Sequence, residues 1–192
     1  MQVVARRDGI LLRKIEYSDT PDIVRWRNKD AVRLNFIDQR LFTPESHEYW
    51  LKNFVETGKV DQLIICVLKE GMPDEETSYE PVGSVYFRDL DHTHRKAEYG
   101  IFIGEDSARG KGVGSKVAEL MLEYGFGTLH LHRIYLRAYA ENLQAIKSYE
   151  NAGFVREALL RDDVFTGGCF HDIVLMGAIN PEETNISAAS KG

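Results

Sequence analysis

The sequence predicts an α/β fold in which a mixed central β-sheet of about six to seven strands is flanked by about four helices. Three short strand-like runs follow one another in the middle of the chain, and strands alternate with amphipathic helical segments in the second half. Successive strands pair antiparallel, whereas a crossover helix brings parallel strands together, so we expect the sheet to contain both pairings.

The N-terminal elements are predicted from apolar runs and helix-start signals. Residues 10–15 form the expected first strand. Capping side chains ahead of a proline at residues 18–21 start a helix that runs to about Asn28. The same signal at residues 43–45 starts a second helix, which ends near Gly58.

The remaining elements follow from changes in hydrophobic period. Residues 63–68, 82–90 and 97–103 are expected strands, with an exposed acidic loop over residues 70–80. After Gly112 the period becomes helical. A strand at 132–138, a helix at 142–152 and strands at 154–160 and 173–179 complete the prediction. Residues 1–180 are expected to form one domain, and residues 181–192 a flexible C-terminal tail.

Composition excludes several classes of protein. The 192 residues are 43% hydrophobic, which is enough for one core, and the net charge of -6 with a pI near 5.5 disfavours nucleic acid as a partner. No stretch approaches the roughly 18 apolar residues of a membrane span, and the N-terminus lacks a signal peptide, so we expect no membrane partner and a cytoplasmic protein. The histidines and the two cysteines are not spaced as a zinc set, so no metal is predicted.

A glycine-rich loop lies between an expected strand and the strongest expected helix. It comprises Arg109, Gly110, Lys111, Gly112, Val113, Gly114 and Ser115. Main-chain N–H groups and the positive end of a helix dipole would converge there, which favours an anion, and the two basic side chains add charge suited to two linked phosphates. The plainer interpretation is a glycine-rich turn that only enters a helix.

Two better-known phosphate loops do not fit this segment. A P-loop requires four residues between its first glycine and Gly-Lys-Ser/Thr, but five separate Gly104 from Gly110, and Gly112 follows Lys111. The dinucleotide fingerprint G-x-G-x-x-G also fails in either register.

Two motifs instead resemble the GNAT superfamily of N-acetyltransferases. Arg109-x-x-Gly112-x-Gly114 is similar to its acetyl-CoA pyrophosphate loop, and Asn142-x-x-Ala145-x-x-x-Tyr149 is similar to the following helix, which flanks the pantetheine arm. The resemblance covers residues 10–179 and implies a GNAT-like sheet. Weaker patterns, including Trp26-Arg27-Asn28, resemble the RimJ/RimL subgroup.

The resemblance implies acetyl-CoA as the donor and assigns a set of cofactor-binding residues. Main-chain N–H groups of residues 101–103 would polarise the thioester carbonyl. The implied set is Ile101, Phe102, Ile103, Arg109, Gly110, Lys111, Gly112, Val113, Gly114, Ser115, Asn142, Ala145 and Tyr149.

Two catalytic residues are expected. Tyr149 would protonate the leaving thiolate, unless it is a core tyrosine packed beside Phe154. Glu98 is the first candidate for the base that deprotonates the amine, although a carboxylate on a solvated strand face is an equal interpretation.

The predicted function is acetyl-CoA-dependent N-acetylation of a primary amine by direct attack in a ternary complex, because no cysteine is expected near the thioester. The acceptor would be a small molecule such as a polyamine or amino sugar, or a protein N-terminus. A non-catalytic acyl-CoA-binding sensor or assembly module is the alternative, and a longer acyl donor stays open. Dimers are frequent among similar enzymes, so a homodimer is one assembly we consider.

Overall fold

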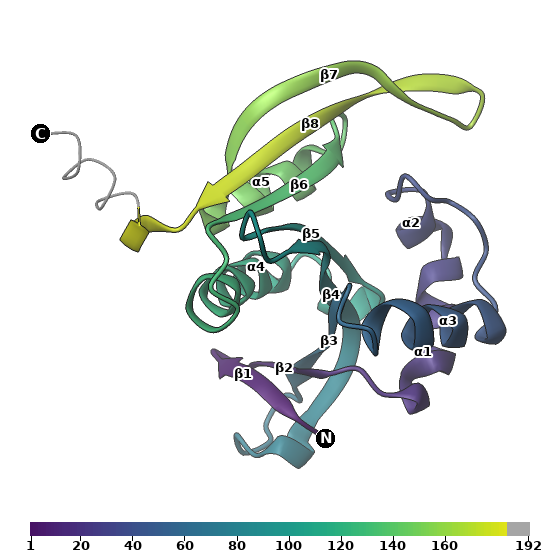
Figure 1. Cartoon of the computed structure of the whole chain (residues 1–192). Helices are drawn as coiled ribbons and strands as arrows, with labels where there is room; N and C mark the ends of the chain where they lie inside the picture. The colour runs from purple at the N-terminus through teal and green to yellow at the C-terminus, as the bar shows by residue number, and fades with distance from the viewer. Residues whose placement is uncertain (184–192) are drawn as a thin grey trace, which may run out of the picture.

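The computed structural model describes residues 1–183 and confirms an α/β fold around one mixed sheet (Figure 1). Most of the tail expected at residues 181–192 lies outside the described residues. The eight strands have the order β1-β2-β3-β4-β5-β6-β8-β7. They are β1 (Val3–Arg7), β2 (Ile10–Lys14), β3 (Asp61–Leu68), β4 (Tyr79–Asp91), β5 (Lys96–Ile103), β6 (Arg133–Tyr139), β7 (Val155–Thr166) and β8 (Cys169–Ile179).

Two groups of helices accompany the sheet (Figure 1). The N-terminal group is α1 (Thr20–Asn28), α2 (Asp30–Arg33) and α3 (Pro44–Trp50), and the last continues as a π-helical turn over Leu51–Val55. The second group is α4 (Val113–Glu123), which also ends in a π-helical turn, and α5 (Leu143–Ala152). The helices predicted from Pro21, Pro44, Gly112 and Asn142 therefore all begin at or next to those residues.

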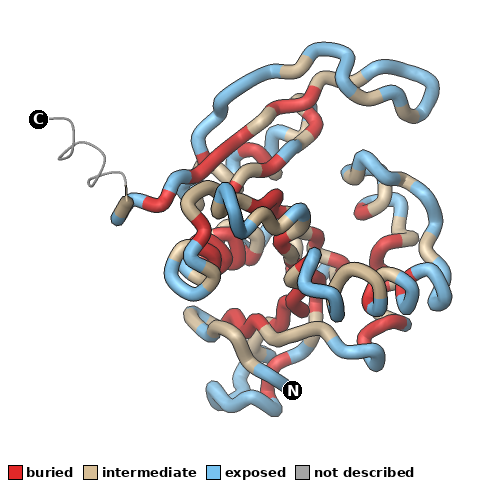
Figure 2. Tube along the Cα trace, in the orientation of Figure 1, coloured by how far each residue is buried: buried red, intermediate tan, exposed pale blue. Residues whose placement is uncertain are grey.

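The central strands are largely buried (Figure 2), and consecutive residues along them belong to different cores. Leu12, Leu63 and Ile65 belong to the larger core, which includes α4 and α5, whereas Leu11 and Ile64 belong to a smaller core with α1. Alternation along a strand produces this division, because successive side chains point to opposite faces. The continuous apolar runs of the sequence are thus explained by burial on both sides.

The predicted counts of strands and helices were too low. We did not expect β1 or α2. β1 is a half-buried edge strand whose Arg6 and Arg7 interrupt the apolar pattern, and pairing with β2 rather than local sequence fixes it. α2 has only one turn, which is too short to produce a helical period.

The last hairpin is longer than predicted. β7 continues beyond residue 160 to Thr166, and β8 starts at Cys169. The sequence pattern breaks at Asp162, where the pairing register shifts and the residue adopts a φ of 53°. Such a bulge interrupts the alternation used for prediction without ending the strand. The hairpin extends past the sheet, and most of β7 is exposed (Figures 1 and 2).

β5 and β6 separate along their length, and this separation positions the site. They are the parallel pair, joined only from Lys96 to Glu98 on β5 and from Arg133 to Tyr135 on β6. Beyond Glu98, β5 remains paired with β4 on its other side. One edge of β5 from Tyr99 onward therefore lacks a strand partner in the described chain, and the sheet is open there.

Candidate functional site

A cavity of about 610 Å³ lies at the opening between β5 and β6. We call one part the glycine end. It comprises the start of α4 and one side of α5, with Arg109, Gly110, Gly112, Val113, Gly114, Ser115, Asn142, Gln144, Ala145, Lys147, Ser148, Tyr149 and Asn151. We call the other part the arginine end. It comprises Asn35, Phe36, Ile37, Asp38, Tyr86, Arg88, Glu98, Gly100, Phe102, Arg137 and Tyr139.

The glycine loop adopts the conformation of an open helix start. Gly110 and Gly112 have φ values of 70° and 75°, in the left-handed region that favours glycine. Gly112 is the N-cap of α4 and has no side chain to accept from the first-turn N–H groups. Those N–H groups are left for an external acceptor, and the helix dipole favours an anion there.

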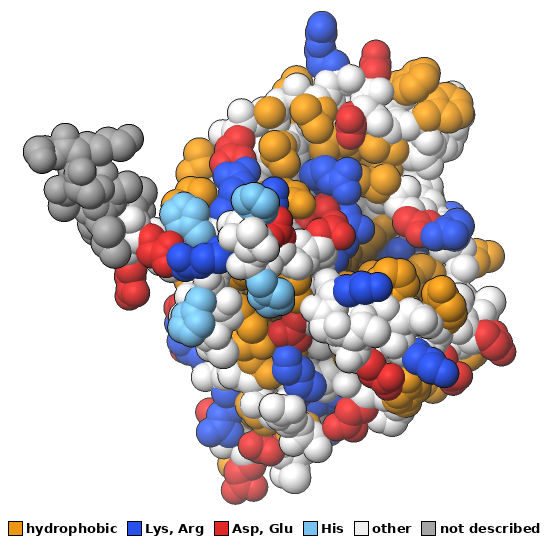
Figure 3. All heavy atoms as spheres, in the orientation of Figure 1, with side chains coloured by type: hydrophobic (Ala, Val, Ile, Leu, Met, Phe, Trp, Pro, Cys, Tyr) orange, Lys and Arg blue, Asp and Glu red, His pale blue; other side chains and the backbone are white. Residues whose placement is uncertain are grey.

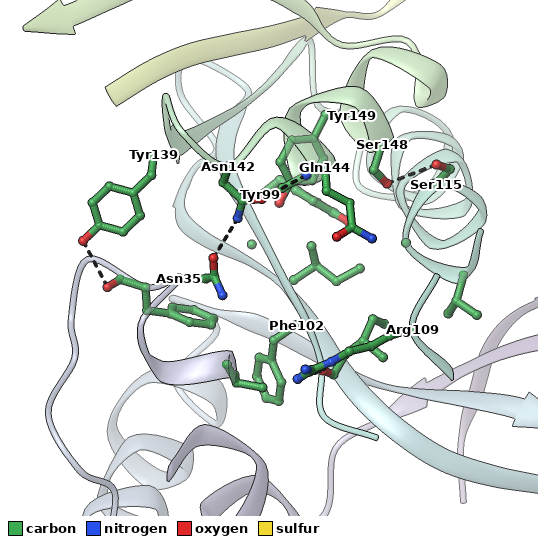
Figure 4. Close-up of a pocket in the computed structure, with 18 of the residues that line it drawn as sticks. Asn35, Tyr99, Phe102, Arg109, Ser115, Tyr139, Asn142, Gln144, Ser148 and Tyr149 are labelled. Carbon is green, nitrogen blue, oxygen red and sulfur yellow. Dashed lines mark hydrogen bonds between the residues drawn. The ribbon is translucent and has the colours of Figure 1, made fainter. Parts of the chain in front are cut away.

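Gly114 is required for a different structural reason, the close approach of two helices. A Cβ at this position would lie 3.1 Å from the Ser148 hydroxyl oxygen of α5. The Ser115 and Ser148 hydroxyls are hydrogen bonded at 3.0 Å, so the two helices approach closely (Figure 4). Gly112 provides the backbone turn, whereas Gly114 provides the space between helices.

The two basic residues of the loop behave differently. Arg109 extends back to β5, where its Nε and Nη2 donate to the Ile103 carbonyl at 3.1 and 3.0 Å. It therefore secures the loop to the open strand as well as placing charge beside the loop. Lys111 is exposed and does not line the cavity.

The open edge of β5 presents alternate main-chain groups to the cavity. Gly104 donates its N–H to Val82 of β4, so alternation turns the backbone of Phe102 toward β4 and that of Ile101 and Ile103 away from it. The Ile103 carbonyl is the group that Arg109 contacts. Among residues 101–103, Ile101 and Ile103 have the orientation expected for polarising a carbonyl.

The motif residues Asn142, Ala145 and Tyr149 all line the cavity, as the helical spacing predicts. Figure 4 shows Asn142 and Tyr149 there. Asn142 is the N-cap, and its side-chain oxygen accepts from the Ala145 N–H at 3.1 Å. Its amide nitrogen donates to Asn35, in the turn after α2, at 2.9 Å. Asn142 thus connects the glycine end to the arginine end.

Tyr149 belongs to an aromatic cluster with Tyr99 and Phe154. Its ring lies 6.0 Å from Tyr99 and 6.1 Å from Phe154, in edge-to-face geometry. Burial raises the pKa of Tyr149, which keeps the phenol protonated at neutral pH. Within residues 1–183, the Tyr99 hydroxyl is buried without a hydrogen-bond partner. Packing beside Phe154 and exposure to the cavity therefore coexist at Tyr149.

Glu98 is held between two arginines rather than on a solvated strand face. Its side chain is 6% exposed, and Oε1 accepts from Arg88 at 2.7 Å and from Arg137 at 3.1 Å. Oε2 accepts a weaker bond from Arg137 at 3.4 Å. A substrate ammonium would have to displace a guanidinium to reach this carboxylate.

Sequence reasoning missed the arginines of the arginine end. Arg88 faces Glu98 across the β4–β5 register, while Arg137 lies two residues beyond Tyr135, the β6 partner of Glu98. No local pattern brings these three together, because β6 reaches β5 only through the crossover that includes α4. Strand-face alternation within 133–139 marks Arg137 as polar but does not indicate its partner.

Other site classes find no support in the described residues. Residues 1–183 contain no group of three or more histidine, cysteine, aspartate or glutamate side chains able to hold a metal ion. The helices seen over this range are too short or too polar to traverse a bilayer. Basic and acidic side chains are interspersed on the face seen in Figure 3.

Comparison with known proteins shows the family of the chain. The sequence-family model described as acetyltransferase (GNAT) domain matches residues 10–155. The chain is 29% identical over 157 residues to spermidine N(1)-acetyltransferase of Escherichia coli (strain K12), covering 80% of this chain and 84% of that protein.

Solved structures share the fold. The crystal structure of spermidine N-acetyltransferase from Vibrio cholerae in complex with CoA and spermine superposes with a TM-score of 0.82 at 23% identity, covering 93% of this chain and 100% of the other. A dodecameric structure of spermidine N-acetyltransferase from the same organism gives a TM-score of 0.74 at 23% identity, covering 94% and 99% of the two chains.

Proposed function

The chain belongs to the GNAT acetyltransferase family and is an acetyl-CoA-dependent N-acetyltransferase, and we propose how its own residues carry out the transfer. The observation that carries this proposal is the cavity, which joins the open N-terminus of α4 to the open edge of β5. An acyl-CoA placed there would have its diphosphate at the glycine end and its thioester beside Ile101 and Ile103.

We assign the diphosphate to the loop that starts α4. The first-turn N–H groups of Val113, Gly114 and Ser115 are the donors, and the dipole of an eleven-residue helix adds to their attraction for an anion. Gly110 and Gly112 give the loop its conformation, and Arg109 holds it against β5. Lys111 contributes charge from solvent.

We assign the reacting centre to the gap between β5 and α5. The amine nitrogen attacks the thioester carbonyl carbon, and main-chain N–H groups at Ile101 and Ile103 stabilise the negative oxygen that forms. The C–S bond then breaks, and Tyr149 donates to the departing thiolate of CoA. The side chain of Ala145 is small enough to leave room for the pantetheine arm.

Deprotonation of the amine requires a base near the reacting centre. Glu98 remains the candidate base, acting directly or through water, but both its oxygens accept hydrogen bonds from guanidiniums. We expect Glu98→Gln to distinguish the roles. Loss of the acidic limb of the pH–rate profile would support a base, whereas an unchanged profile with a higher acceptor KM would assign Glu98 to holding Arg88 and Arg137.

Acceptor-dependent release of CoA tests the proposed function. Purified protein would be given acetyl-CoA with spermidine, amino sugars or N-terminal peptides, and the free thiol would be measured while calorimetry follows acetyl-CoA binding. Spermidine belongs in this panel because relatives are spermidine acetyltransferases. Binding of acetyl-CoA without CoA release by any acceptor would instead support the non-catalytic sensor. The RimJ/RimL-like subgroup and the cytoplasmic location stay predictions.

Self-association through the last hairpin is a further part of the proposal. Leu159, Phe165 and Phe170 are 54%, 63% and 61% exposed on β7 and β8, and a structural neighbour is dodecameric. Apolar side chains gathered on one element are typical of protein interfaces. Analytical sedimentation would compare the molecular mass of the wild type with that of Phe165→Ser. Equal masses would argue against self-association through the hairpin.

A further inference from the structure

Counted together with the buried Arg27 behind it, the arginine end holds one more guanidinium than carboxylates. Arg88 and Arg137 share one carboxylate, Glu98. Asp38 also lines the cavity, but its carboxylate accepts from Arg40 at 2.7 and 2.9 Å. Both oxygens of Glu98 therefore already accept from guanidiniums, and Asp38 is already paired with the exposed Arg40.

Arg27 of α1 adds a buried charge behind the cavity. Arg27 is 4% exposed and forms no ion pair within residues 1–183. The guanidinium carbon lies 3.6 Å from the ring centroid of Phe36, which lines the cavity, and Nη2 donates to the Asp38 carbonyl at 3.1 Å. With the exposed Arg40 beside Asp38 and the exposed Asp89 beside Arg88 included, four guanidiniums stand against three carboxylates.

Arg88 retains hydrogen-bonding capacity. It donates to Glu98 with Nη2, and its Nη1, which unlike the enclosed Nε is not buried, makes no hydrogen bond in the described part of the chain. The nearest other carboxylate oxygen, on Asp89, is 3.9 Å from Nε and belongs to an exposed side chain. A guanidinium presents five N–H donors, and a carboxylate or phosphate can accept two of them side by side.

We propose, building on the proposed function, that the acceptor is a primary amine whose molecule also carries an oxyanion, a carboxylate or a phosphate, and that Arg88 and Arg137 bind this oxyanion. Charges of one sign that line a cleft add to one another, so the excess of guanidiniums acts across the cavity. It attracts an anionic acceptor and opposes a polycation.

The same charge assists the chemistry. An amine must lose its proton before it attacks the thioester, and neighbouring cations lower the pKa of an ammonium group. An acceptor held by its oxyanion beside Arg88 and Arg137 would therefore present more of its neutral amine near pH 7. This effect reduces the demand on Glu98 as a base.

Matched acceptors that differ only in the anionic group test the proposal on the full chain. The pairs are glucosamine 6-phosphate with glucosamine, and β-alanine with its amide, and spermidine is the polycation. We expect at least one anionic member to exceed its neutral partner by about tenfold or more in kcat/KM, with spermidine below it. The two pairs separate phosphate from carboxylate recognition. The KM of the preferred anion should rise with ionic strength.

Charge-removing variants locate the effect. Arg88→Gln and Arg137→Gln should each reduce the preference for the anionic member of the pair while leaving acetyl-CoA affinity unchanged. Arg133→Gln is the matched control, because Arg133 lies on the same strand as Arg137 but pairs with Glu157 at 2.7 Å outside the cavity. If Arg88→Gln or Arg137→Gln fails to fold, the acceptor pairs and the salt dependence measured on the wild type still test the proposal.

Two results would overturn the inference and leave N-acetylation intact. One is higher kcat/KM with spermidine than with both anionic acceptors, and the other is an anion preference that survives both arginine variants. Acetyl-CoA binding without CoA release by any amine would instead remove the proposed function on which the inference rests.

Discussion

The two ends of the cavity are built by different means. At the glycine end, main-chain groups of one continuous segment provide the binding surface, because Gly112 starts α4 without a side-chain cap. At the arginine end, side chains from three strands and the turn after α2 provide it, centred on Glu98 between Arg88 and Arg137. A main-chain site depends little on the identity of side chains, whereas a site built from side chains changes with each substitution.

The largest expected effect separates the reaction from binding at the glycine end. Tyr149→Phe removes the proposed proton donor but keeps the ring that packs against Tyr99 and Phe154. We expect kcat to fall by about a hundredfold or more, in the range for loss of a general acid. Acetyl-CoA affinity, measured by calorimetry, should stay within about twofold because the aromatic packing is retained. An unchanged kcat would remove Tyr149 from the mechanism.

Sequence was informative where structure is local. The helix starts and the glycine loop could be predicted from the sequence because caps, prolines and glycines act within one turn. β1 and the extension of β7 were missed because pairing across the sheet, including the bulge at Asp162, determines them. The contacts of Arg88, Glu98 and Arg137 depend on strand order and register, which no single segment encodes.

A buried histidine joins two of the N-terminal helices. His47 of α3 is 1% exposed, and its Nδ1 lies 2.9 Å from the Thr20 hydroxyl oxygen of α1. Burial lowers the pKa of His47 to about 4 from 6.5. In the unfolded chain His47 takes up a proton near pH 6.5, whereas in the folded chain it stays neutral until about pH 4.

Stability should therefore fall as the pH is lowered through that window. One proton taken up by the unfolded state changes the free energy of unfolding by about 1.4 kcal/mol per pH unit, or roughly 2 kcal/mol between pH 6.5 and about pH 5. Urea unfolding of the wild type and His47→Gln would measure this term. Equal pH slopes for the two proteins would show that His47 does not titrate as proposed.

A smaller effect tests whether backbone conformation sets coenzyme affinity. Gly112 has a φ of 75°, and a Cβ there meets nothing within 4 Å, so Gly112→Ala introduces strain without a clash. A left-handed alanine costs roughly 1–2 kcal/mol, and relaxation of the loop would weaken acetyl-CoA binding by about tenfold.

Gly58 supplies the matched control. It has a φ of 73° and equally open space, but it lies outside the cavity, at the turn after the second predicted helix. Gly58→Ala should lower the melting temperature as Gly112→Ala does, with acetyl-CoA affinity unchanged. Equal losses of affinity in both variants would mean that strain acts through general stability rather than through the loop.

The smallest expected effect tests whether a side chain outside the motifs, the Tyr99 hydroxyl, also binds acetyl-CoA at the glycine end. The Tyr99 hydroxyl is buried in the cavity wall with no hydrogen-bond partner among residues 1–183, and its ring lies 6.0 Å from that of Tyr149. An unsatisfied buried hydroxyl is destabilising, so we expect Tyr99→Phe to raise the free energy of unfolding by about 1 kcal/mol in chemical denaturation. Acetyl-CoA should stabilise the wild type and Tyr99→Phe equally. If acetyl-CoA stabilises the variant less than the wild type, the Tyr99 hydroxyl contacts acetyl-CoA. The glycine end would then depend on a side chain as well as on main-chain amides.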